Sequence, residues 1–189
     1  IGYEKDKKLL NYFSKSGVME IEAALFSSGR SPNYYRKDKF TFWKLPQFKD
    51  KDPKTLFSQH DSKIKESISE ITGIDPELRH IMAGKKNAKI ASVEKLINFT
   101  RIDADWLDLK LKENHFDIIM CHASNNELPK LSELLSQAKT ILKKDGKFAL
   151  LATKRDACSA SKTCGFTCSE EKEIRRGNSS LFLHILKLK

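Results

Sequence analysis

The sequence predicts an α/β fold in which helices flank a mostly parallel sheet. Short apolar runs that end in Gly, Asp or Asn alternate with longer segments of helical period, the pattern of repeated strand–helix units. The run 116–121, Phe-Asp-Ile-Ile-Met-Cys, is apolar on both faces, as a strand inside a parallel sheet is. With 189 residues and 39% hydrophobic content, the chain is long enough for one full core, so we expect a single domain over residues 1–189.

The first half of the chain predicts two strand–helix units separated by an insertion. Residues 8–13 predict the first strand, and the helix that follows, 18–26, has an apolar face made of Val18, Ile21, Ala24 and Leu25. Residues 69–74 predict the second strand. Pro76 favours a helix start there, continuing to about residue 91, because proline is tolerated in the first turn. Residues 27–65 fit no strand–helix unit and are longer than an ordinary connection, so we expect an insertion with its own role.

The second half continues the alternation. Residues 97–101 predict the third strand and residues 116–121 the fourth. Pro129 opens a helix whose apolar stripe comprises Leu131, Leu134, Leu135, Ala138, Ile141 and Leu142. Lys-Asp-Gly at 144–146 ends this helix, and residues 147–152 predict the fifth strand. Residues 181–188 alternate imperfectly and predict a closing strand in a hairpin.

Charge and cysteine usage limit the class of partner. The formal charge of +10 and the pI near 9.4 favour a polyanion. No apolar run approaches the roughly 18 residues of a membrane span, so we expect a cytoplasmic protein without membrane contact. The four cysteines, Cys121, Cys158, Cys164 and Cys168, form no C-x-x-C pair, so we expect reduced thiols and no metal, even with His184 near the last three. Because the chain starts with Ile1, we expect a piece of a longer protein.

The first strand–helix turn carries a resemblance to a known family. Residues 11–25 read N-Y-F-S-K-S-G-V-M-E-I-E-A-A-L, which resembles the first motif of the RNA methylase family, D-P-F-C-G-S-G-T-x-x-I-E-A-A. The match continues in order through Gly73-Ile74-Asp75, Asn87-Ala88, Ile97-Asn98-Phe99, Asp103-Ala104 and Phe116-Asp117-Ile118-Ile119, and covers roughly residues 9–152. The stretch 31–43 is similar to the insertion of bacterial large-subunit ribosomal RNA guanine-N2 methylases.

The resemblance implies a class I, S-adenosylmethionine-dependent methyltransferase fold: a Rossmann-like, mostly parallel seven-stranded sheet with an antiparallel closing strand. It assigns cofactor binding to Ser14, Ser16, Gly17, Asp75, Asp103 and Ala104. Independently, a strand that opens through a small-residue turn into a helix presents amides to a charged ligand, and a carboxylate after the second strand can accept ribose hydroxyls. The alternatives stay open: Asp75 as a helix cap before Pro76, and Asp103 as a turn residue.

Two departures from the family pattern concern the site itself. Lys15 stands where the family has its first glycine, a replacement that costs about 1–2 kcal/mol if the backbone takes positive φ. Its side chain either swings outward or meets the cofactor carboxylate. Residues 122–125, His-Ala-Ser-Asn, replace the N-P-P-Y that holds and stacks the target base, which leaves His122 and Asn125 as the catalytic candidates. The alternative is that His122 is a loop residue with no role.

The insertion interleaves rings with cations, the two components of single-stranded nucleic-acid binding. The expected RNA contacts are Tyr34, Tyr35, Arg36, Lys37, Lys39 and Trp43. The alternative is that Phe40, Phe42 and Trp43 anchor the insertion to the sheet.

Three functional hypotheses follow. The first is an active enzyme that methylates an exocyclic guanine nitrogen in ribosomal or transfer RNA, without a metal, because alignment of the methyl group with the nitrogen lone pair supplies most of the rate. The second is a catalytically inactive RNA-binding module with the same fold. The third, DNA adenine methylation, is disfavoured by the missing N-P-P-Y motif.

Overall fold

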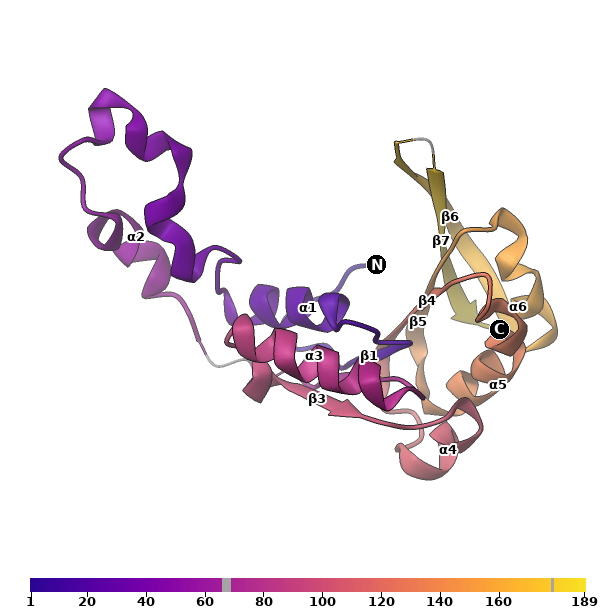
Figure 1. Cartoon of the computed structure of the whole chain (residues 1–189). Helices are drawn as coiled ribbons and strands as arrows, with labels where there is room; N and C mark the ends of the chain where they lie inside the picture. The colour runs from indigo at the N-terminus through magenta and orange to yellow at the C-terminus, as the bar shows by residue number, and fades with distance from the viewer. Residues whose placement is uncertain (66–68, 178) are drawn as a thin grey trace.

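The computed structural model describes residues 1–65, 69–177 and 179–189, and is built around one seven-stranded sheet (Figure 1). The strand order is β3-β2-β1-β4-β5-β7-β6. All neighbouring pairs from β3 to β5 are parallel, and β7 runs antiparallel to both β5 and β6. The strands are β1 (Leu9–Tyr12), β2 (Ile71–Ile74), β3 (Ile97–Thr100), β4 (Phe116–Ala123), β5 (Leu142–Ala152), β6 (Phe166–Arg176) and β7 (Ser179–Leu188).

Helices cover both faces of the sheet, so two apolar clusters form. On one face α1 (Val18–Ser28) and α3 (Leu78–Ile90) pack on β2 and β3. On the other face α4 (Leu107–Lys110), α5 (Leu131–Ile141) and α6 (Ser159–Thr163) pack over β4 to β7. Strand order reverses between β1 and β4, which is where parallel α/β sheets bind ligands.

The predicted fold class is confirmed, and so are the six predicted strands and the apolar stripe of α5, whose Leu131 to Ile141 members are buried. Several local predictions were wrong. Strand β4 runs on to Ala123 instead of ending at Cys121, and β5 begins at Leu142 rather than at 147. The sequence did not specify β6, nor the short helices α4 and α6.

The buried face of α1 also differs from the prediction. Val18 is 58% exposed, whereas Glu20 is fully buried at 0%. The helix turns its Glu20, Ala24 and Ser27 side towards the sheet, so a carboxyl group lies in the core. The predicted apolar face is therefore wrong at its first position and misses the charged residue.

The predicted insertion is a projecting arm, here defined as residues 30–65 (Figure 1). It consists of three short 3₁₀ segments, η1 (Tyr34–Lys39), η2 (Thr41–Lys44) and η3 (Pro46–Phe48), followed by α2 (Pro53–Asp61). The two ends of the arm meet, because the Lys65 amide donates to the Ser28 carbonyl at 3.0 Å. Among the described residues, no helix is both long enough and apolar enough to cross a lipid bilayer.

Candidate functional site

The turn between β1 and α1 lies at the reversal point of the sheet and has an unusual backbone. Phe13 and Lys15 take φ values of 59° and 53°, and Gly17 takes 77°. The turn is tied to the end of β2, because the Ser14 amide donates to the Ile74 carbonyl at 3.0 Å and the Lys15 amide to Asp75 Oδ2 at 3.0 Å. A lysine thus holds the left-handed conformation that glycine adopts at no steric cost.

Gly17 caps the N-terminus of α1 and is required there for two reasons. Its positive φ disfavours a side chain, and a Cβ would lie 2.9 Å from the Phe99 ring and 3.0 Å from Gly84 Cα. Ser16, next to it, is exposed at the mouth of the turn, and its carbonyl accepts a hydrogen bond from Asn87 Nδ2 at 2.9 Å. Hydrogen bonds to the end of β2 and to α3 therefore hold the turn and the start of α1 in place.

Asp75 follows β2 directly but is only 1% exposed. Its Oδ2 accepts from the Lys15 amide, and its Oδ1 accepts from the Glu77 amide at 2.9 Å and lies 2.9 Å from His80 Nδ1. The bond to the Glu77 amide closes an Asx turn before α3. The N-cap of α3 is Glu77, so Asp75 is not the helix cap that the sequence left open as an alternative. In this conformation both oxygens of Asp75 are engaged by the protein.

Asp103 follows β3 and is exposed, while Ala104 beside it is buried. Both carboxylates lie near the Tyr12 hydroxyl: burial, and next the charges of Asp103 and Asp75, raise the pKa of Tyr12 above its ordinary value. The ends of β2 and β3 are also joined directly, because Arg101 Nε donates to the Pro76 carbonyl at 2.8 Å.

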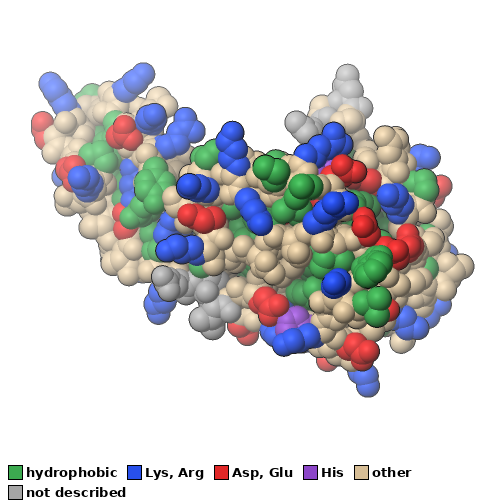
Figure 2. Space-filling model, turned by 60° about the horizontal axis from the view of Figure 1, so that its bottom comes forward, with side chains coloured by type: hydrophobic (Ala, Val, Ile, Leu, Met, Phe, Trp, Pro, Cys, Tyr) green, Lys and Arg blue, Asp and Glu red, His purple; other side chains and the backbone are tan. Residues whose placement is uncertain are grey.

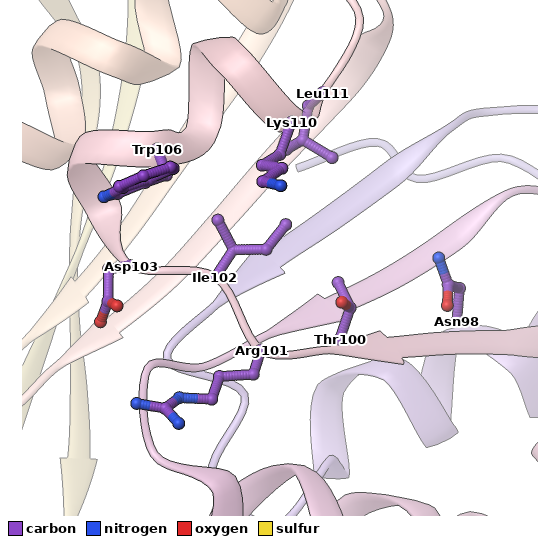
Figure 3. Close-up of a pocket in the computed structure, with 8 residues that line it drawn as sticks. All are labelled: Asn98, Thr100, Arg101, Ile102, Asp103, Trp106, Lys110 and Leu111. Atoms are coloured by element: carbon purple, nitrogen blue, oxygen red, sulfur yellow. The ribbon is translucent and has the colours of Figure 1, made fainter.

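An open cleft of about 560 Å³ adjoins Asp103. Figure 3 shows that the Ile102 side chain points towards Lys110 and Leu111, whereas the Asp103 carboxylate points the opposite way. The lining residues are Asn98, Thr100, Arg101, Ile102, Asp103, Trp106, Lys110 and Leu111. Asp75, Ser16 and Gly17 are not among them, so this cleft lies beside the reversal point and not in it.

The Lys15 side chain crosses the reversal point from β1 to the loop after β4. Its Nζ lies 2.9 Å from Glu127 Oε2 and donates to the His122 carbonyl at 3.0 Å. Burial favours the protonated form of Glu127, but hydrogen bonds from the Ser124 amide and from Lys15 outweigh it and lower the pKa of Glu127. We call the Lys15–Glu127 ion pair the latch, because it joins the turn after β1 to the loop after β4.

The structure separates the two predicted catalytic residues. His122 lies within β4, paired with Leu151, and not in the loop after it. Burial and then the charge of Lys15 lower the pKa of His122, so its imidazole is neutral at neutral pH. Asn125 is exposed in the loop, where its Oδ1 accepts a hydrogen bond from the Thr153 hydroxyl at 2.8 Å. Cys121 is fully buried, and burial raises its pKa, so it is no nucleophile.

Beneath the turn lies a polar group that the sequence analysis missed. Glu20 is completely buried, and among the described residues its carboxyl oxygens, Asn11 Oδ1 and Ser14 Oγ have no hydrogen-bond partner. Burial raises the pKa of Glu20, and the nearby Ser14 and Asn11 side chains offset this only in part. Gly73 makes the space, since a Cβ there would collide with Glu20 Oε1. Ser14, expected at the cofactor, is itself buried.

The arm divides the predicted RNA-binding residues into two groups. Tyr35, 63% exposed, and the exposed Arg36 and Lys39 face solvent. The other three pack inside the arm. Lys37 pairs with Asp61 and lies 4.0 Å from the centre of the Tyr34 ring, and Trp43 Nε1 donates to the Lys37 carbonyl.

The aromatic rings of the arm form a small core of their own. Phe42 lies within 4.7–6.5 Å, centre to centre, of four other rings: Phe40, Trp43, Phe48 and Phe57. The alternative in the sequence analysis was that Phe40, Phe42 and Trp43 anchor the insertion to the sheet. These rings do have a structural role, but they pack against one another within the arm. Residues 34–65 carry nine Lys and Arg against four Asp, and Figure 2 shows these basic side chains spread over the arm.

Comparison with known proteins identifies the family. The family model described as "RMKL-like, methyltransferase domain" matches residues 1–184. Ribosomal RNA large subunit methyltransferase K/L of Vibrio cholerae is 30% identical over 131 residues, 67% of this chain and 18% of that protein. A tRNA (guanine(6)-N2)-methyltransferase of Methanocaldococcus jannaschii is 31% identical over 150 residues, 74% of this chain and 38% of that protein. The chain thus spans well under half the length of these relatives.

Solved structures agree in fold. A protein named SMU.472, crystallised with SAH, superposes with a TM-score of 0.83 at 16% identity, over 100% of this chain and 50% of that one. TrmN from Thermus thermophilus superposes with a TM-score of 0.63 at 16% identity, over 97% of this chain and 44% of that one. Fold, motif order and family match therefore agree, and the chain belongs to the RMKL-like methyltransferase-domain family, a class I S-adenosylmethionine-dependent group related to ribosomal and transfer RNA methyltransferases.

Proposed function

We propose that this domain methylates an exocyclic guanine nitrogen in ribosomal or transfer RNA, and that the latch must open before the cofactor enters. The observation that carries the proposal is that the β1 turn, Asp75 and Asp103 all lie at the carboxyl edge of the parallel strands, with Asp75 bonded to the turn and both carboxylates near Tyr12. A relative named for guanine-N2 methylation of transfer RNA supports the choice of base.

The residue types at this edge fit an adenosyl ligand. Asp75 would accept the ribose hydroxyls, and Asp103 with the Ala104 amide would hold the adenine ring. The amides of Ser16 and Gly17 at the start of α1 suit the carboxylate of the cofactor. When bound, S-adenosylmethionine supplies the methyl group; the chain itself supplies orientation and exclusion of water. Asp75 would have to give up its bond to the Lys15 amide, so turn and latch move together.

The target amino group needs acceptors on the β4 side. A neutral His122 ring can accept one hydrogen bond, and Asn125 Oδ1 another once Thr153 releases it. Two acceptors that orient the nitrogen lone pair towards the methyl group would contribute through alignment. Without an aromatic ring in the N-P-P-Y position, base binding loses about 1–3 kcal/mol of stacking. Slow transfer is therefore expected.

The test combines cofactor binding with methyl transfer. Lys15→Gly and Glu127→Gln each break the latch, and only Lys15→Gly also relieves the backbone of the turn. Both should tighten S-adenosylmethionine binding by up to about fivefold, as about 1 kcal/mol for a partly exposed ion pair implies. Isothermal titration calorimetry measures this. Adding Asp75→Asn to either variant should abolish binding. Labelled methyl should then appear in guanine nucleosides of digested ribosomal or transfer RNA, and its absence from every RNA contradicts the proposal.

The latch favours a second candidate, an RNA-binding module without catalysis. Lys15 Nζ already has two acceptors on the β4 side, which stabilises the form in which the latch is closed. If neither latch variant binds S-adenosylmethionine while the chain still binds RNA, this second function is the correct one.

A further inference from the structure

We propose that Cys158, Cys168 and His184 form a divalent metal site of the zinc type at the outer edge of the sheet. One ligand atom from each residue lies within 4.8 Å of the others. The residues come from three elements: the 3₁₀ turn η7 (Arg155–Cys158), β6 and β7. The site lies in the C-terminal part of the chain, outside the reversal point between β1 and β4.

The strand pairing explains why these side chains meet. Cys168 pairs with Leu186 and Glu171 pairs with His184, with a register shift between Cys168 and Glu170. Ser169 is the extra residue, so Cys168 and Glu171 point to the same side although they are three positions apart, an odd number that would otherwise place them on opposite sides. Leu186 belongs to the core on the α6 side, and both cysteines pack against that core. The bulge therefore re-aims the thiol and the carboxylate towards His184.

His184 gives the independent indication of a ligand. Its side chain is 0% exposed, and neither ring nitrogen has a hydrogen-bond partner within the described part of the chain. The Glu171 carboxylate and the Lys154 carbonyl lie close enough to favour the protonated ring, and the Arg155 guanidinium opposes it, but no neighbour meets the full distance and angle of a hydrogen bond. A buried polar group is normally satisfied, so an imidazole without a well-formed hydrogen bond needs an explanation. A bound cation supplies it.

The contact between His184 and Glu171 is also one that a metal-bound histidine makes. Its Nδ1 lies 3.6 Å from Glu171 Oε2, and metal-bound histidines usually direct their second nitrogen to a carboxylate. Glu171 is itself held by Arg155, whose Nε lies 2.7 Å from its Oε1. This arrangement leaves Nε2 of His184 for the cation.

The donor set matches zinc in chemistry and size. Two thiolates and one neutral imidazole around a divalent cation leave a neutral site, and binding releases one proton from each thiol. Tetrahedral zinc needs ligand atoms about 3.5–3.8 Å apart, so a closure of about 1 Å by side-chain rotation is enough. Both cysteines are partly exposed, which provides an entry path and leaves the fourth position to water.

The experiment is a titration of the reduced, metal-free chain with cobalt(II), followed by displacement with zinc. We expect one equivalent to bind with the near-ultraviolet charge-transfer band of a thiolate–cobalt complex, and zinc to raise the melting temperature. Cys168→Ser removes a direct ligand, so its loss of affinity should exceed the roughly 10–100-fold that is usual for altering a partner of a ligand. Cys164→Ser, a partly exposed cysteine in the same region but outside the cluster, is the matched control and should bind like the unmodified chain.

Two results would overturn the proposal. One is a reduced chain that binds no stoichiometric cobalt or zinc. Thiol titration of the untreated chain then shows whether Cys158 and Cys168 form a disulfide instead. The other is cobalt binding that Cys168→Ser leaves unchanged. The melting temperature of the metal-free Cys168→Ser variant verifies that this variant folds. Glu171→Gln gives a second measurement on a residue that is not a ligand, and its expected loss of cobalt affinity is smaller than that of Cys168→Ser.

Discussion

Lys15 combines two roles that a glycine could not combine. Its backbone adopts φ 53°, which costs a side-chain-bearing residue about 1–2 kcal/mol, and its Nζ joins Glu127 and the His122 carbonyl. The ion pair and the hydrogen bond of its Nζ act against this backbone cost. One residue therefore sets both the shape of the turn and the closure of the site.

At the residue scale, Glu20 yields a prediction about stability and pH. Burial raises the folded-state pKa of Glu20 above its unfolded value, so the folded chain keeps the proton longer as pH rises. The free energy of unfolding should therefore fall as pH increases from the ordinary glutamate range through the raised folded pKa, and stay low above it. Glu20→Gln should remove that slope and stabilise the chain at neutral pH by roughly 1–3 kcal/mol, because an amide can donate to Asn11 Oδ1.

Urea denaturation at a series of pH values measures this effect. Glu22→Gln is the control, because Glu22 is exposed on the same helix and its replacement should change stability by less than about 0.5 kcal/mol. A Glu20→Gln variant that is less stable than the starting chain at neutral pH would show that the carboxylate has a favourable partner.

At the scale of elements, the arm holds together through its own rings. Phe42→Ala should cost the arm about 2 kcal/mol, less than a fully buried phenylalanine, because Phe42 is half-buried. The sheet should be unaffected, since the cluster packs within the arm. In a Trp106→Phe background, Trp43 is the only tryptophan, so its fluorescence reports unfolding of the arm alone.

Tyr35→Ala serves as the comparison, because Tyr35 is 63% exposed and its loss should leave the arm transition nearly unchanged. If Phe42→Ala lowers the melting temperature of the whole chain to the same extent as that of the arm, the two parts unfold together and the arm has no core of its own.

The elements also show what a sequence can and cannot predict. The stripe of α5 was predictable because apolar residues recur at helical spacing and all face the sheet. Strand β6 was not, because its residues 169–173 are polar: it is an edge strand, and edge strands carry charge that prevents further pairing. His122 was placed outside β4 because the apolar run ends one residue earlier, although backbone pairing with Leu151 continues.

The candidate site was predictable only in part, because some of its contacts join residues that are far apart in the sequence. Strand ends and turn residues predicted that Gly17, Asp75 and Asp103 lie at one edge of the sheet, because parallel strands bring their carboxyl ends together. Their role in cofactor binding stays a prediction. The latch joins residues 112 positions apart and depends on the β1–β4 contact. Glu20 was missed since a carboxyl group at a helix position next to apolar residues normally faces solvent.

At the scale of the whole molecule, the arm projects from the body, and its ends meet at Ser28 and Lys65 (Figure 1). Replacing residues 30–64 with a short Gly-Ser linker should therefore leave the sheet folded, with a melting temperature within a few degrees of the original. RNA affinity should fall, and the slope of log affinity against log salt should decrease by roughly 0.7–0.9 for each lost phosphate contact.

Filter binding at several salt concentrations measures both quantities. The double variant Lys85→Ala and Lys86→Ala removes charge from α3 outside the arm and should change the slope much less. Unchanged salt dependence after removal of the arm would move RNA recognition to another surface.

The arm joins the body at one place, where the Lys65 amide donates to the Ser28 carbonyl. Because the polypeptide leaves and re-enters the body at this point, changes in the length, charge or aromatic content of the arm leave the strand pairing of the sheet intact. Under the proposed function, exchange of the thirty-odd residues of the arm at this one junction would change the RNA target and leave the sheet with its site unchanged.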